Sequence, residues 1–81
     1  MRNKKINVRE NERKEVRAMN LYVLRVYFAY GYVIERPIIA ESLEQAGALA
    51  ELIIAEEGYR YEGLAEAYCF NESGTECVDV Y

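Results

Sequence analysis

Residues 42–58 read Ser-Leu-Glu-Gln-Ala-Gly-Ala-Leu-Ala-Glu-Leu-Ile-Ile-Ala-Glu-Glu-Gly, and this stretch decides the fold. Ser42 followed by Gln45 forms a capping box, which predicts the start of a helix. The apolar residues after it recur at helical spacing and predict one buried stripe. They are Leu43, Ala46, Ala50, Ile53 and Ile54, with Leu49 beside the stripe. Gly58 suits the left-handed conformation that ends a helix, so we expect the helix to stop at residue 57.

Two strand-like segments precede this helix. Residues 20–30 and 32–40 are rich in β-branched and aromatic side chains, and Gly31 between them predicts a hairpin turn. Pro37 has no N–H to donate to a neighbouring strand. The second strand therefore belongs at the edge of a sheet or is interrupted at Pro37. Within the helix, Gly47 predicts close packing of the backbone.

Two more strand-like segments follow the helix. Residues 64–71 and 75–81 predict a second hairpin, whose turn contains Gly74. The order β-β-α-β-β predicts an α+β fold, in which one helix packs on one face of an antiparallel sheet. A chain of 81 residues is enough for a single domain. We place this domain at residues 20–81, after an N-terminal basic arm or weak helix at residues 1–19.

The charges divide the chain at the same point. Residues 1–19 hold seven basic and three acidic side chains, a net charge of +4. Residues 20–81 hold three basic and eleven acidic side chains, a net charge of −8. The arm could bind phosphates, but the three acids that interrupt its basic run favour a solvated segment, such as a frayed helix. The acidic body should repel nucleic acid and attract basic protein surfaces.

The composition argues against a membrane protein and against catalysis. No run of about 18 apolar residues could cross a bilayer, and no apolar signal core follows the N-terminus. We therefore expect a cytoplasmic protein. The chain has no histidine, two cysteines, and no nucleotide-binding or nucleophile motif. We expect no metal, no cofactor and no enzymatic activity.

Strand parity predicts which side chains share a face of the sheet. Ala65, Ala67 and Cys69 are small and suit the helix side. Cys77 then lies on the opposite face from Cys69, which predicts two free thiols. The first strand admits either parity. If Leu24 faces the helix, the other face collects Arg25, Tyr27, Glu35, Glu66, Tyr68, Phe70, Asp79 and Tyr81.

Tyrosine is unusually frequent, at eight of 81 residues. Tyrosine suits interfaces because its ring is buried while its hydroxyl stays hydrated. The alternative is that the tyrosines border a small core that lacks tryptophan. We predict that the partner-binding residues are Tyr27, Glu44, Glu51, Glu66, Tyr68, Phe70, Asp79 and Tyr81. Of these, Glu44 and Glu51 share the solvent side of the helix.

The layout of residues 20–81 resembles that of small anti-CRISPR inhibitors of type I systems, which phages and other mobile elements encode. The matching stretches are Ile38-Ile39-Ala40-Glu41-Ser42-Leu43-Glu44-Gln45-Ala46 and the strand pair in residues 66–81. The resemblance implies a non-catalytic inhibitor in the host cytoplasm. Its acidic body would occupy a lysine-rich nucleic-acid channel of a host protein, such as a CRISPR effector complex.

The sequence leaves two other functions open. A nucleic-acid-binding module would grip phosphates with the arm and stack bases on Tyr27, Tyr68 and Phe70. Arg25 is the one cation expected on that face, which argues against this function. A structural homo-oligomer, in its simplest form a homodimer, would assemble through the same residues.

Overall fold

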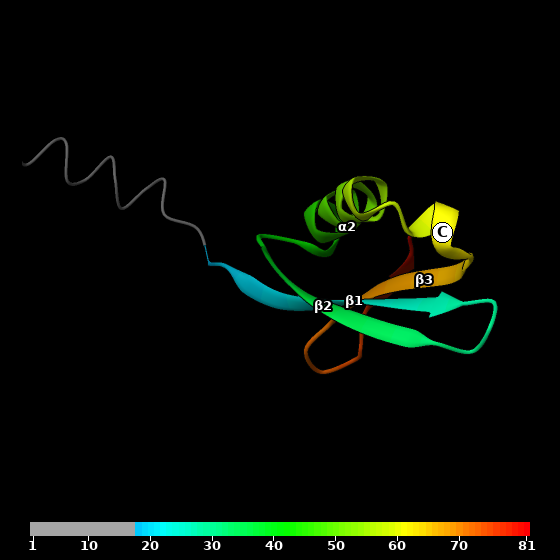
Figure 1. Cartoon of the computed structure of the whole chain (residues 1–81). Coiled ribbons are helices and arrows are strands. Elements are labelled where there is room, and N and C mark those ends of the chain that lie inside the picture. The colour runs from blue at the N-terminus through cyan, green and yellow to red at the C-terminus, as the bar shows by residue number, and fades with distance from the viewer. Residues whose placement is uncertain (1–17) are drawn as a thin grey trace, which may run out of the picture.

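The computed structural model describes residues 18–81, which form a four-stranded antiparallel sheet with one long helix on one face (Figure 1). The elements are β1 (Asn20–Phe28), β2 (Val33–Ala40), α2 (Leu43–Glu57), the 3₁₀ helix η1 (Tyr59–Glu62), β3 (Leu64–Asn71) and β4 (Cys77–Asp79). The strand order across the sheet is β2-β1-β3-β4. The predicted α+β class and β-β-α-β-β order are confirmed. Residues 1–17 of the predicted arm lie outside the described residues.

Helix α2 begins and ends where its capping residues predicted. Ser42 Oγ accepts a hydrogen bond from the Gln45 N–H at 3.2 Å. Gln45 Oε1 accepts in turn from the Glu41 N–H at 2.6 Å, one residue further back than in the usual capping box. Gly58 ends the helix with a φ of 69°, a conformation that glycine adopts without the penalty of a Cβ.

The core lies between α2 and the sheet. Its buried residues are Tyr22, Leu24, Val26, Phe28, Ile38, Ala40, Ala46, Ala50, Ile54, Tyr59, Leu64, Ala67 and Cys69. Leu24 therefore faces the helix, which settles the parity of β1. Small residues on both sides let the helix lie close to the sheet. A Cβ on Gly47 would come within 3.4 Å of a Val78 methyl group, so the predicted close packing there is confirmed.

Strand β2 lies at an edge of the sheet, as Pro37 predicted. The Phe28 N–H donates to the Tyr32 carbonyl at 2.8 Å. Hydrogen-bonded and non-hydrogen-bonded residue pairs alternate along an antiparallel ladder, and Phe28 and Tyr32 form a hydrogen-bonded pair. The pair of Val23 and Pro37 is therefore not hydrogen-bonded, and the Pro37 nitrogen points away from β1, toward the free edge. Because proline has no N–H, this edge is poorly suited to pairing with a strand of another chain.

A bulge in β3 corrects one prediction of parity. Tyr27 of β1 pairs with Glu66, whereas the next residue, Phe28, pairs with Leu64. Ala65 is the extra residue left between these pairs, and its side chain is exposed. The prediction that Ala65 faces the helix is therefore wrong.

A second irregularity, at the C-terminal end, corrects the placement of Tyr81. The N–H groups of Val80 and Tyr81 both donate to the Ala67 carbonyl, at 2.9 and 3.2 Å, and the Ala67 N–H donates back to Tyr81. Two residues opposing one form a bulge, which turns Tyr81 to the helix side of the sheet. Its ring centroid lies 5.7 Å from the Arg60 guanidinium of η1. The prediction that Tyr81 faces away from the helix is wrong.

The two cysteines are free and lie on opposite faces of the sheet, as predicted. Cys69 is buried against α2, whereas Cys77 is exposed on β4. Burial also raises the pKa of the Cys69 thiol. Since the thiolate is the reactive form, both effects protect Cys69 from modification.

We expect a chromogenic disulfide reagent to modify one thiol of the native protein quickly and the second only on unfolding. The Cys77→Ser variant should lose the fast phase and keep the slow one. The time course of absorbance, with and without denaturant, measures both phases. Two fast thiols, or none, in the native wild-type protein would contradict the face assignment.

Candidate functional site

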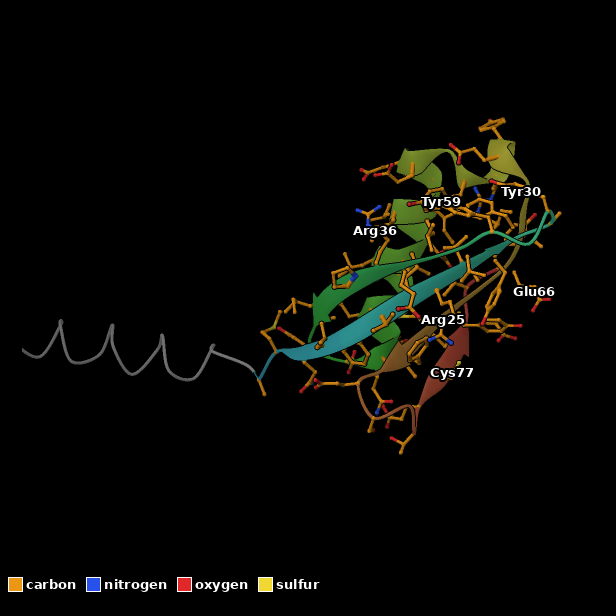
Figure 2. The ribbon with its side chains drawn as sticks, turned by 60° about the horizontal axis from the view of Figure 1, so that its bottom comes forward. Arg25, Tyr30, Arg36, Tyr59, Glu66 and Cys77 are labelled. Carbon is orange, nitrogen blue, oxygen red and sulfur yellow. The ribbon has the colours of Figure 1, made fainter. Side chains whose placement is uncertain are left out.

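The sheet face turned away from α2 has no covering element within residues 18–81, and Figure 2 looks onto it. Paired residues of adjacent strands share a face, so the strand registers give its members. We call this surface the open face. It consists of Leu21, Val23, Arg25, Tyr27, Val33, Glu35, Pro37, Ile39, Glu66, Tyr68, Phe70, Cys77 and Asp79.

A charged row crosses the middle of the open face. Glu35, Arg25, Tyr68 and Asp79 pair in succession from β2 to β4. Arg25 Nε donates to Glu35 Oε2 at 2.6 Å. The same guanidinium lies 4.7 Å from the centroid of the Phe70 ring. The charge of Arg25 is therefore paired with neighbours within the chain. Asp79 extends the row at its β4 end.

Two tyrosines are held together beside this row. The rings of Tyr27 and Tyr68 meet edge to face, with centroids 5.9 Å apart and planes at 77°. Edge-to-face contact is a favourable geometry for two aromatic rings. The Tyr68 hydroxyl donates a hydrogen bond to the Glu66 carboxylate. This bond raises the pKa of Tyr68 to about 12, because only the neutral phenol can donate it.

An apolar row lies next to the charged one. Pro37, Val23, Phe70 and Cys77 pair in succession across the four strands. Beyond it, Leu21 and Ile39 line an open hollow of about 780 Å³, whose other side carries Glu72 and Glu76. No predicted binding residue lines this hollow. The open face thus sets apolar and aromatic side chains beside carboxylates, as the core and rim of many protein interfaces do.

The eight predicted binding residues fall on three separate surfaces. Tyr27, Glu66, Tyr68, Phe70 and Asp79 lie together on the open face. Glu44 and Glu51 are exposed on α2, which covers the opposite face of the sheet (Figure 1). Tyr81 lies beside Arg60 on the helix side. One flat partner surface could therefore contact the first group or the helix glutamates, but not both.

The sequence analysis missed an aromatic cluster at the turn between β1 and β2. The Phe28 ring contacts Tyr30, Tyr32 and Tyr59, with centroids 5.7, 5.9 and 5.7 Å apart. Tyr30 and Tyr32 remain 68% and 56% exposed. The signal in the sequence was two aromatic residues flanking the turn glycine, Gly31.

The interior offers no second candidate. Within residues 18–81 no polar or charged residue is buried, and no three His, Cys, Asp or Glu side chains gather as metal ligands. No helix in this part of the chain is long and apolar enough to span a membrane.

No protein-family model, curated protein or solved structure matches the chain. The candidate site therefore rests on the geometry of its surface.

The hydrogen bond between Tyr68 and Glu66 gives a pH-dependent prediction. In a protein with ¹³C-labelled tyrosine, we expect the Tyr68 phenol to titrate at about 12, and the Glu66→Gln variant to move it toward its ordinary value of 10.0. The folded-state pKa is raised, so the stability from this bond is complete below pH of about 10 and is lost as pH rises toward the folded value.

The control is the Glu62→Gln variant, which removes an exposed carboxylate from η1 and should leave the Tyr68 titration unchanged. A Tyr68 phenol that titrates at its ordinary value in the wild-type protein would contradict the hydrogen bond.

Proposed function

We propose that this chain is a non-catalytic protein-binding module, a small acidic inhibitor that covers the basic nucleic-acid-binding surface of another protein, such as a CRISPR effector complex. The observation that carries the proposal is the open face. Its apolar and aromatic side chains lie beside the carboxylates of Glu35, Glu66 and Asp79. The resemblance to type I anti-CRISPR inhibitors supports the choice of a nucleic-acid-handling partner.

The charge distribution supports a basic partner. Residues 18–81 contain three arginines and eleven carboxylate side chains. Each arginine already has neighbours within the chain: Arg25 contacts Glu35 and Phe70, Arg36 contacts Tyr59 and Glu57, and Arg60 contacts Tyr81. The field around this part of the molecule is therefore negative. Such a field speeds the encounter with a basic surface and selects against acidic ones.

The same contacts disfavour the two alternative functions. Surfaces that stack single-stranded bases combine aromatic rings with cations that hold the phosphates, whereas Arg25 is held by Glu35. A homodimer through the open face would confront the carboxylates of Glu66 and Asp79 with those of a second copy. A homodimer through the edge of β2 would meet Pro37, which lacks an N–H.

The experiment is a pull-down with the tagged full chain from bacterial lysate, with and without nuclease, read by mass spectrometry. We expect the wild-type chain to retain a nucleic-acid-binding protein and to displace nucleic acid from it in a gel shift. The Glu66→Lys/Asp79→Lys double variant should weaken this binding at least tenfold, which corresponds to about 1.4 kcal/mol. Phe70→Ala should weaken it as well.

The matched control is the Glu44→Lys/Glu51→Lys double variant, which makes the same change in net charge on the opposite side of the molecule. It should bind like the wild-type chain if the open face makes the contact. Equal binding by all variants, each folded by circular dichroism, would reject the open face. Recovery that disappears with nuclease would favour a nucleic-acid-binding module instead.

A further inference from the structure

The hollow at one end of the open face lies where the described part of the chain begins. Its walls come from the start of β1, from Ile39 of β2 and from the turn between β3 and β4, which is orange in Figure 1. Strand β3 pairs with β1 only as far as Tyr22 and Asn71, and the chain then turns. Asn20 and Leu21 therefore pair with β2 alone, and the hollow lies beside this start of β1.

Apolar side chains in the hollow are exposed to water. Ile39 is 55% exposed, and so is Met19, the residue directly before β1. Leu21, which pairs with Ile39, is half-buried. A segment that covered these three neighbouring side chains would remove them from water, which favours docking. The hollow, at about 780 Å³, lies within the size range of protein binding sites.

The charges of the hollow are unbalanced within residues 18–81. The two charged residues that line it there are Glu72 and Glu76, and both are exposed. The three arginines of this part of the chain contact other residues, and none of them lines the hollow. Residues 18–81 therefore supply no cation to these two carboxylates.

Basic side chains stand in the sequence directly before the hollow. Residues 1–17 hold seven basic and three acidic side chains, a net charge of +4. The nearest of them, Arg17, is two positions before Met19, which itself lines the hollow. A segment tethered so closely acts at an effective concentration of about a millimolar, so weak contacts are enough to dock it.

We propose that residues 1–17 dock in the hollow of their own chain. Their basic side chains pair with Glu72 and Glu76, and apolar ones such as Val16 cover Leu21. A second copy of the chain carries the same side chains, but its segment is not tethered to this hollow. The tether and the complementary charge together select the chain's own segment as the occupant.

Docking in the hollow leaves the far part of the open face exposed. Glu66 pairs with Tyr27, which is six residues along β1 from Leu21, a distance of about 20 Å. A basic partner could still reach Glu66 while the segment is docked. The inference concerns contacts within one chain, so it holds or fails independently of the proposed function.

The test places a nitroxide spin label on the exposed thiol of Cys77, next to Glu76, while the buried Cys69 stays unlabelled. NMR then follows the amide signals of residues 1–14 in the ¹⁵N-labelled full chain. Docking brings these residues close to the label, so we expect their signals to broaden. The Glu72→Lys/Glu76→Lys variant should lower the ratio of docked to undocked segment about fivefold, and the broadening with it.

This double variant should keep the turn between β3 and β4. The Asn71 side chain donates to Thr75 Oγ1 at 3.0 Å and accepts from the Glu76 backbone N–H at 3.0 Å. Neither bond uses a glutamate side chain. The matched control, Glu44→Lys/Glu51→Lys, makes the same change in net charge on α2 and should keep the broadening. Full broadening in the folded Glu72→Lys/Glu76→Lys variant, or equal loss in both variants, would overturn the proposal.

A mixed sample shows which chain provides the hollow. A ¹⁵N-labelled chain without spin label is mixed with a spin-labelled chain that carries no ¹⁵N, and its signals should stay sharp. Broadening in this sample would show docking between copies and would overturn docking within one chain. Raising the salt from about 0.1 M to about 1 M shortens the Debye length from about 10 Å to about 3 Å, so it should release the segment. Broadening that ignores salt would contradict the pairing with Glu72 and Glu76.

Discussion

The packing of a single helix against one face of the sheet is the constraint on which the rest of the structure depends. Ala46 and Ala50 of α2 lie in the same buried cluster as Ala67 of β3, and these short side chains let the two layers approach closely. Residues 18–81 supply one long helix for a four-stranded sheet. One face is therefore buried and the other keeps its side chains for contacts outside the core.

In this arrangement the charged groups lie on the surface, whereas the buried cluster that stabilises the fold is apolar. The buried cluster contains no polar or charged residue within residues 18–81, and no buried side-chain nitrogen or oxygen there lacks a hydrogen bond. Charged groups instead pair across the surface, as Arg25 does with Glu35 and Arg36 with Glu57. The result is a surface whose rings and carboxylates are positioned by contacts within the chain.

Local signals in the sequence predicted most of the fold. Ser42, Gln45 and Gly58 set the helix limits because capping depends on neighbouring residues. The alternation of side chains along a strand predicted that Glu66, Tyr68 and Phe70 share a face. This prediction succeeded because that stretch of β3 is regular. The same argument failed at the extra residues of the bulges, which exist only once two strands are paired.

The aromatic cluster at the turn between β1 and β2 could not be predicted for a related reason. Strand parity says nothing about side chains in a turn, and the directions of Tyr30 and Tyr32 follow from the backbone at Gly31. The Tyr30 ring also lies close to Gly63, which is more than thirty residues away in the chain. Contacts of this kind are fixed by tertiary structure. The sequence showed only that aromatic residues flank a glycine.

The alternation along β1 has a consequence for how such a protein can evolve. Leu24 and Val26 face the core, whereas Val23, Arg25 and Tyr27 between them face outward. Under the proposed function, selection for stability and selection for recognition would act on different residues of one strand. The outward positions could then change with the partner while the inward ones keep the architecture. A lineage built in this way can diverge until its members share a fold and little recognisable sequence.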